Sequence, residues 1–404
     1  MPRLRECATA LAVIAVFALL ARAMDPVKPS SDAAGSGTKV VTKDEALKKA
    51  AANAPRIELA LLLDTSNSMD GLINQARAQL WKIVNDLATA EKDGKTPNLR
   101  VALYEYGNQG LPTDGGFVRQ VLPLTDDLDK VSEQLFALST NGGDEYCGRV
   151  IESATQGLAW SKSDEDLKII VIAGNEPFTQ GPVDYKKACA EAAAKGIMIN
   201  TIHCGSREEG IATGWEDGAK LADGTYAHID QNQQVVEIAT PFDAELNKLS
   251  IQLNGTFHFY GTATVRQRLT TNQAAQDSNA AALGASISAE RAATKAGGAY
   301  RFNSDLVKLY LADPQAVDEL KEEDLPSDLQ DKSSAERKKI LDKSAAERQS
   351  LQKKINELAA KRDAYIAEAR KTEVASPSAA PTLDAALLPA LREQAEAKDF
   401  SFEK

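Results

Sequence analysis

Three oxygen-bearing side chains follow an apolar run near the start of the chain. Asp64, Ser66 and Ser68 come directly after residues 57–63, which are mostly apolar and too few to form a helix. Such a run predicts a buried central strand, and the alternate positions after it can aim one carboxylate and two hydroxyls into one small space. A hard cation such as Mg2+ prefers oxygen ligands and keeps positions open for water or an outside carboxylate. The alternative interpretation is that Ser66 or Ser68 caps the following helix without any metal.

Residues 64–68 carry the pattern Asp-x-Ser-x-Ser between a hydrophobic strand and an amphipathic helix. This pattern resembles the first motif of the metal-ion-dependent adhesion site in von Willebrand factor type A (VWA) domains. The resemblance implies Mg2+ or Mn2+ at the site and a protein partner that offers a carboxylate to the metal. It also fits the rule that open α/β sheets place ligands at the carboxyl ends of their strands.

In the same family a second loop usually supplies a threonine after a Gly-Gly turn. Here Asp144 follows Gly142-Gly143, so the resemblance makes Asp144 the second-loop oxygen ligand, with Thr140 as the alternate. Asp144 could instead cap the helix that follows it. The predicted metal ligands are therefore Asp64, Ser66, Ser68 and Asp144.

The third loop departs from the family pattern. The family's Thr-Asp-Gly-Glu-Pro is matched here by residues 173–177, which puts Gly174 at the position of the usual aspartate. Losing that carboxylate should weaken metal affinity or transfer its role to Asn175 or Glu176. Whether metal binds is the main question that this loop leaves open.

Apolar strands alternate with amphipathic helices between residues 55 and 253, the range of the VWA-like domain. This order predicts an α/β fold with a doubly wound, mostly parallel six-stranded sheet covered on both faces. A helix near residues 241–253 should close it. The strands are expected at residues 57–63, 99–106, 117–122, 166–173, 196–203 and 225–229.

After this domain, residues 254–372 read as a helical, partly coiled-coil region. Residues 331–341 nearly repeat as residues 342–352, and an eleven-residue repeat is typical of a long, almost straight helix, expected here over 332–371. That helix could fold back on a helix over 262–298, pair with another chain, or stand solvated. The remaining residues, 373–404, read as a flexible tail with one weak helix.

The amino terminus reads as a secretory signal. Arg3 and Arg5 precede an apolar stretch, and small residues at positions 21 and 23 suit cleavage before Met24, so residues 1–23 are the predicted signal peptide. Residues 24–54 then form a linker with a short helix. We expect a periplasmic or extracellular protein.

Charge limits the partners. The formal net charge is −11, and it becomes −13 without residues 1–23, which hold three arginines and one glutamate. Such an acidic chain is a poor ligand for nucleic acid or an anionic membrane surface.

Cysteine and histidine content restricts the chemistry further. Beyond the signal, Cys147 and Cys204 are the preferred disulfide pair, although three buried thiols with Cys189 explain the sequence equally well. No four-ligand spacing supports zinc, and no Gly-x-Ser-x-Gly motif supports a serine hydrolase. His258 lies among aromatic residues and is expected to be packed rather than catalytic.

Two functions remain. The first is an exported, non-enzymatic binding module that mediates metal-dependent protein–protein interaction, with self-association possible through the C-terminal helix. The alternative is an envelope structural or scaffold protein that acts through its helical half with no bound metal. No catalytic residue, small-molecule substrate or further cofactor is predicted.

Overall fold

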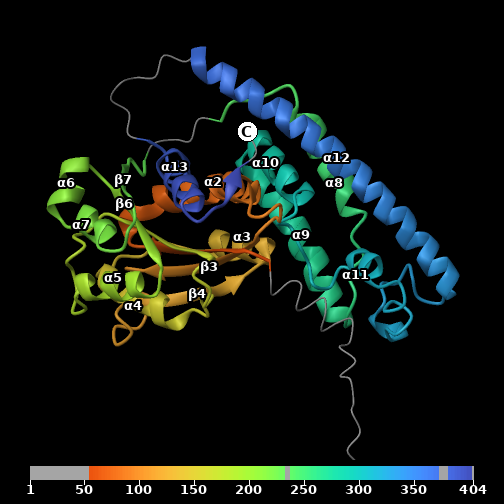
Figure 1. The fold of residues 1–404 in the computed structure, drawn as a ribbon, viewed down its shortest axis with the longest axis horizontal. Coiled ribbons are helices and arrows are strands. Elements are labelled where there is room, and N and C mark those ends of the chain that lie inside the picture. Colours follow the sequence, from red (N-terminus) through yellow and green to blue (C-terminus); the bar gives the residue numbers. More distant parts are fainter. Residues whose placement is uncertain (1–53, 233–236, 373–380, 403–404) are drawn as a thin grey trace, which may run out of the picture. The chain divides into compact units, whose positions relative to one another are not determined.

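The computed structural model describes residues 54–232, 237–372 and 381–402. The predicted signal peptide and almost the whole linker before residue 54 lie outside this part of the chain. Within it, the fold is the one expected from the sequence, a six-stranded, mostly parallel sheet with helices on both faces, followed by a helical region (Figure 1).

The sheet has the strand order β4-β3-β1-β5-β6-β7. Strands β3, β1, β5, β6 and β7 run parallel to one another, and the edge strand β4 pairs antiparallel with β3. The central strand β1 is buried along nearly all its length, because it has a hydrogen-bonded neighbour on each side and helices on each face. The strands are β1 (Arg56–Asp64), β3 (Asn98–Tyr106), β4 (Val118–Thr125), β5 (Leu167–Gly174), β6 (Met198–Cys204) and β7 (Tyr226–Ile229).

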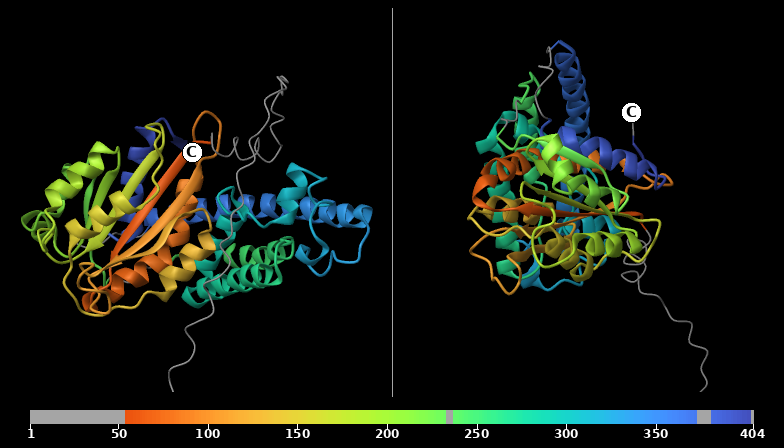
Figure 2. Two further views of the ribbon diagram at one scale, coloured as in Figure 1. Left: turned by 90° about the horizontal axis from the view of Figure 1, so that it is seen from below. Right: turned by 90° about the vertical axis from the view of Figure 1, so that its left-hand side faces the viewer.

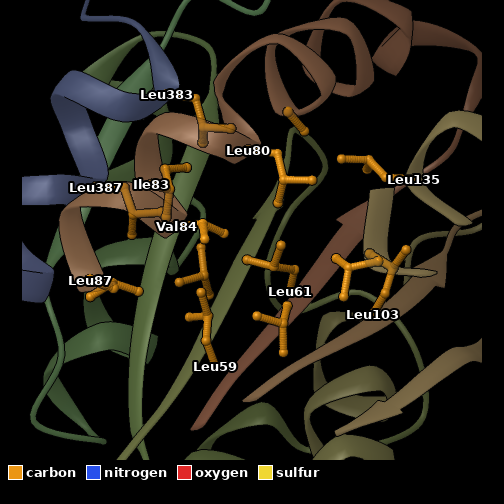
Figure 3. Packing of buried hydrophobic residues seen from close by; sticks show 14 of the residues in the cluster. Leu59, Leu61, Leu80, Ile83, Val84, Leu87, Leu103, Leu135, Leu383 and Leu387 are labelled. Carbon is orange, nitrogen blue, oxygen red and sulfur yellow. The ribbon is translucent and has the colours of Figure 1, made fainter. Parts of the chain in front are cut away.

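Alternate residues of β1 enter two different cores. Leu59 and Leu61 face the core that contains α2, whereas Ala60 and Leu62 face the opposite core. Figure 3 shows the first of these, with Leu80, Ile83 and Val84 of α2 packed over the sheet. The helices of the domain are α2 (Asp70–Ala88), α3 (Leu128–Ala137), α4 (Cys147–Gly157), α5 (Tyr185–Ala194), α6 (Arg207–Ala212) and α7 (Trp215–Lys220).

The helical region is built around the 39-residue helix α12 (Ser334–Thr372), which carries the eleven-residue repeat. Its Leu351 and Ile355 pack on α8 and α10 within the same chain. Of the arrangements expected for this long helix, the structure thus has the one in which it folds back on the chain (Figure 2). The expected helix over 262–298 is broken at Gly284, whose φ of 140° interrupts it. The remaining helices here are α8 (Asp243–Asn254), α9 (Ala263–Leu283), α10 (Ala285–Ala296) and α11 (Leu306–Ala312).

Helix α8 was expected to close the sheet domain, but it packs on α10 and α12 instead. The reason is visible in its buried residues: Leu246, Leu249 and Leu253 all belong to the core of the helical region.

A buried ionic network joins the α9–α10 pair to the sheet domain. Arg291 of α10 donates to Asp129 of α3 at 2.7 Å and to Asp277 of α9, while Tyr300 donates to the other oxygen of Asp129 at 2.7 Å. The Arg291 guanidinium also lies 4.7 Å from the ring centroid of Trp81 on α2. Since buried charges are tolerated only when they are paired, this network fixes how the two parts meet.

The tail differs most from expectation. Residues 383–396 form a helix, α13 (Leu383–Glu396), that packs on α2, β6 and β7 of the sheet domain. Leu387 and Leu391 are buried in the same core as β1, and Figure 3 shows Leu387 beside Ile83 and Leu87. The short strand β8 (Ser401–Phe402) then pairs with β2 (Ala90–Glu91).

The first turn of α13 is capped from outside the helix. The backbone N–H groups of Leu383 and Asp384 donate to the side-chain oxygens of Gln75 and Gln79 on α2, at 3.0 and 2.7 Å. These bonds satisfy amides that a helix leaves unpaired at its start. The tail was expected to be flexible because its sequence has only a weak helix pattern; its order comes from α2 and the sheet.

This packing predicts that the tail contributes to stability. We expect Leu391→Ala to lower the free energy of unfolding by about 2–5 kcal/mol, because it removes a fully buried side chain. Glu393→Ala on the exposed side of α13 is the control and should change it by less than about 0.5 kcal/mol. Urea unfolding measures both; equal effects of the two substitutions would show that α13 is not packed on the domain.

Candidate functional site

The site lies where β1 ends. Asp64 is the last residue of β1 and is fully buried. Its Oδ1 accepts the backbone N–H of Ser66 at 2.7 Å, whereas its Oδ2 is buried without any hydrogen-bond partner. A carboxylate oxygen in this condition is costly unless a proton or a cation satisfies it.

The two serines stand beside this carboxylate. The hydroxyls of Ser66 and Ser68 are 3.2 Å apart, and Ser68 Oγ donates to Asn175 Oδ1 at 3.4 Å. Neither serine caps a helix: Ser66 precedes the short 3-10 helix η1 (Asn67–Met69) without a side-chain cap, and α2 starts after Met69. Their hydroxyls therefore remain available to a ligand at the end of β1.

From the second loop, the structure brings Glu145 to Asp64 where the sequence predicted Asp144. Asp144 is exposed, and its Oδ2 accepts the Tyr146 hydroxyl at 3.0 Å. Glu145 is 4% exposed, and its Oε2 is buried without a hydrogen-bond partner. The carboxyl beside Asp64 is therefore that of Glu145 and not that of Asp144, and Thr140, the alternate, bonds to Asp70.

Backbone contacts of the second loop explain this exchange. The N–H of Asn141 donates to the Thr65 carbonyl at 2.9 Å, and the N–H of Glu145 donates to Gln180 Oε1 at 2.6 Å. Gly107, with φ of 78°, makes the room: a Cβ there would lie 2.7 Å from Glu145 Cγ and 2.8 Å from Asp64 Oδ1. No pattern in the second loop itself distinguishes Glu145 from Asp144.

The third loop lacks its carboxylate for a steric reason. A Cβ at Gly174 would collide with the Tyr106 hydroxyl and lie 3.1 Å from Asp64 Oδ2. Tyr106 is fully buried at the end of β3, and its hydroxyl donates to the Ala173 carbonyl at 3.0 Å. The tyrosine thus occupies the space that a side chain at position 174 would need, and Asn175 is the third-loop residue that reaches the serines.

The electrostatics of the site follow from burial. Burial raises the pKa of Asp64, and burial together with the adjacent Asp64 carboxyl raises the pKa of Glu145 to about 10. Two carboxyl groups that meet in a buried place cannot both ionise without compensation, so a proton is retained between them.

The donor set has the chemistry of a hard-cation site. It consists of two carboxylates with orphaned oxygens, two hydroxyls and an amide oxygen, and it contains no nitrogen or sulfur ligand. In the part of the chain that the structure describes, no three His, Cys, Asp or Glu side chains gather as a metal site. A cation here would therefore depend on the hydroxyls, water or a partner to complete its shell.

A second constellation lies in the helical region. His258 Nε2 is 2.9 Å from Ser344 Oγ, and His258 Nδ1 is 3.3 Å from Asp328 Oδ2, which is the order of a serine hydrolase triad. Ser344, however, is nearly buried inside α12, whose backbone N–H groups are used by the helix. An acyl-transfer site needs free donors for its oxyanion, so the arrangement fits a packed histidine that ties residue 258 to α12.

The three cysteines in the described part of the chain, Cys147, Cys189 and Cys204, are free and buried. The preferred pair of Cys147 and Cys204 is wrong, because Cys147 belongs to the core under α4 and Cys204 to the core on the opposite face of the sheet. The structure instead contains three buried thiols, which is the alternative that the sequence allowed. Among the described residues, moreover, no helix is both long enough and apolar enough to cross a bilayer.

The match to a family model agrees with the fold. Residues 58–213 match the family model described as von Willebrand factor type A domain. Similar solved structures include BatB from Bacteroides thetaiotaomicron (18% identity, 43% of this chain, 90% of that chain, TM-score 0.33). Another is the SpRpn10 VWA domain (16% identity, 44% of this chain, 90% of that chain, TM-score 0.34). A third is an aerotolerance-related membrane protein from Bacteroides fragilis (18% identity, 43% of this chain, 92% of that chain, TM-score 0.29). No curated protein matches the sequence.

The buried carboxyl pair predicts an unusual pH dependence of stability. The pKa of Glu145 is raised from 4.5 in the unfolded chain to about 10 in the folded protein. The folded state therefore binds a proton that the unfolded state releases, and stability without divalent cation should fall as pH rises from about 4.5 to about 10. Urea unfolding in EDTA at pH 5.5, 7 and 8.5 measures this slope, at most about 1.4 kcal/mol per pH unit.

Glu145→Gln removes the titrating group and keeps the shape, so its pH profile should be flatter than that of the wild type. Parallel profiles for the two proteins would refute the idea that Glu145 holds the proton.

Proposed function

Because residues 58–213 form a von Willebrand factor type A domain, a kind of domain that mediates protein–protein interaction, we propose that this chain is an exported, non-enzymatic binding module. It attaches to a protein partner through a divalent cation, Mg2+ or Mn2+, held at the end of β1. The residues that would hold the cation are Asp64, Ser66, Ser68 and Glu145.

The observation that carries this proposal is the pair of orphaned oxygens, Asp64 Oδ2 and Glu145 Oε2. Apart from the proton that the two carboxyls retain between them, neither oxygen has a donor in the described residues, and a divalent cation would replace that proton. The bound cation would act as a Lewis acid that accepts a carboxylate from the partner. Ser66 and Ser68 would add hydroxyl oxygens, and Asn175 would orient Ser68 through the bond between their side chains.

Export rests on the sequence alone. Arg3 and Arg5, the apolar stretch of residues 8–20 and the small residues before Met24 support cleavage of residues 1–23 and a periplasmic or extracellular location. Amino-terminal sequencing of the mature protein would test this placement.

The alternative function is an envelope scaffold that acts through its helical half without metal. The observation in its favour is Gly174, which replaces a carboxylate that the family's sites usually contain. In that case self-association would involve the exposed face of α12, because Leu351 and Ile355 are already buried within the chain.

Calorimetric titration of Mg2+ and Mn2+ tests the metal site. We expect wild type and Asp144→Asn to bind alike, since Asp144 is exposed and bonded to Tyr146. Asp64→Asn and Glu145→Gln should each lose at least about tenfold in affinity, because each removes a charged oxygen ligand. Asp144→Asn is matched to Glu145→Gln in chemistry and position, so the pair separates the two neighbouring carboxylates.

Negligible heat for the wild type would leave the scaffold function standing. Loss of binding in Asp144→Asn with none in Glu145→Gln would restore the ligand set expected from the sequence. A chelator-sensitive partner in a pull-down that disappears with Asp64→Asn would connect the cation to attachment.

A further inference from the structure

Four loops beside the site contain no basic residue. The segments that follow β1 and β3, join α3 to α4 and follow β5 are residues 65–69, 107–117, 138–146 and 175–184, and none holds a Lys or Arg. Strands β1, β3 and β5 run parallel, so the segments after them share one edge of the sheet. Hydrogen bonds from Asn141 N–H to Thr65 and from Gln109 N–H to Asn141 bring the α3–α4 segment to the same edge.

Carboxylates are exposed on this rim. Asp70, Asp114 and Asp144 are exposed, and Glu176 is partly exposed and near enough to Glu145 to raise its pKa further. Three of these carboxylates accept hydrogen bonds from neutral groups of the chain. The Thr140 hydroxyl donates to Asp70, the Gly115 N–H donates to Asp114, and the Tyr146 hydroxyl donates to Asp144. Their negative charges are therefore not neutralised by these bonds.

Three arginines near these loops already have partners within the chain. Arg149 reaches the Gly115 carbonyl, but its guanidinium donates to Glu152 at 2.7 Å. Arg119 at the start of β4 pairs with buried Glu105. Arg77 near Asp70 donates to three carbonyls at the end of α3.

The charges around the site do not cancel. A divalent cation would balance Asp64 and Glu145, and Arg77 interacts with Asp70, but Asp114, Asp144 and Glu176 would keep their negative charges, and a partner carboxylate would add another. At separations within the Debye length such like charges repel. A purely acidic partner would thus meet attraction at the metal and repulsion around it.

We propose that this rim selects a partner segment in which an acidic residue is flanked on both sides by lysine or arginine. The acidic residue goes to the cation, and the flanking bases lie against Asp70, Asp114, Asp144 and Glu176. The acidic rim does not stand alone as evidence: the buried, partnerless oxygens of Asp64 and Glu145 at its centre independently indicate that something binds there. This inference rests on the proposed function and specifies its partner.

Three immobilised peptides test the inference on the full chain by biolayer interferometry. They present Lys-Ser-Glu-Ser-Lys, Glu-Ser-Glu-Ser-Glu and Lys-Ser-Gln-Ser-Lys at equal density, in Mn2+ or in EDTA. We expect the first peptide to bind with at least about tenfold higher affinity than the other two, and only in Mn2+. Its affinity should fall between 50 and 300 mM salt because the contacts are ionic.

Charge reversal on the rim provides the matched variants. The double variant Asp114→Lys/Asp144→Lys should bind Lys-Ser-Glu-Ser-Lys with at least about tenfold lower affinity than the wild type and should bind Glu-Ser-Glu-Ser-Glu with higher affinity. Its affinity for Mn2+, measured by calorimetry, should stay within about threefold of the wild-type value. Glu393→Lys on α13 is the control and should change neither, because Lys398, shortly after Glu393, donates to the carbonyl of Asp164, which precedes β5 and so lies at the opposite end of the sheet.

The outcomes separate the two proposals. If the wild type binds Mn2+ but does not prefer Lys-Ser-Glu-Ser-Lys, or binds none of the peptides, the proposed partner chemistry is overturned and the metal site stands. An equal effect of Glu393→Lys also overturns it, since the response would then reflect net charge. Wild type that shows no Mn2+ heat overturns the proposed function and this inference with it.

Discussion

Two carboxyl groups, Asp64 and Glu145, lie buried together at the end of β1 with an oxygen of each left without a donor. Their proximity constrains the surroundings. Position 107 must be glycine, because a Cβ there would press on both side chains. Position 174 is also glycine, because the hydroxyl of Tyr106 fills the space beside Asp64. The site is thus arranged around two buried carboxyls that, without a cation, must retain a proton between them.

The helix that begins at this site also organises the rest of the chain. α2 starts at Asp70, immediately after the serines, and both C-terminal parts pack on it: α10 from the helical region and α13 from the tail. Trp81 of α2 lies under the Arg291 guanidinium, and Gln75 and Gln79 cap α13. One element therefore contacts the candidate metal site, the buried ionic network and the closing helix of the sheet domain.

Much of this could be predicted from the sequence. The six main strands and their parallel arrangement follow from apolar runs alternating with amphipathic segments, and Asp64, Ser66 and Ser68 from their position after β1. Glu145 could not be distinguished from Asp144, because the choice depends on Gly107 and on hydrogen bonds that the N–H groups of Asn141 and Glu145 donate to Thr65 and Gln180, which are far away in sequence. The tail was misjudged for a similar reason: its helix is specified by α2 and the sheet, not by its own pattern.

The position of α13 in the sequence affects how the chain is made. The last strand of the sheet ends at Ile229, and more than 150 residues separate it from Leu383, the first residue of the helix that covers the same core. A chain that has been synthesised only as far as β7 therefore lacks one of the helices that cover this core, although α2 is already present. At an ordinary elongation rate that state lasts for about ten seconds or longer, during which a chaperone could bind the uncovered face.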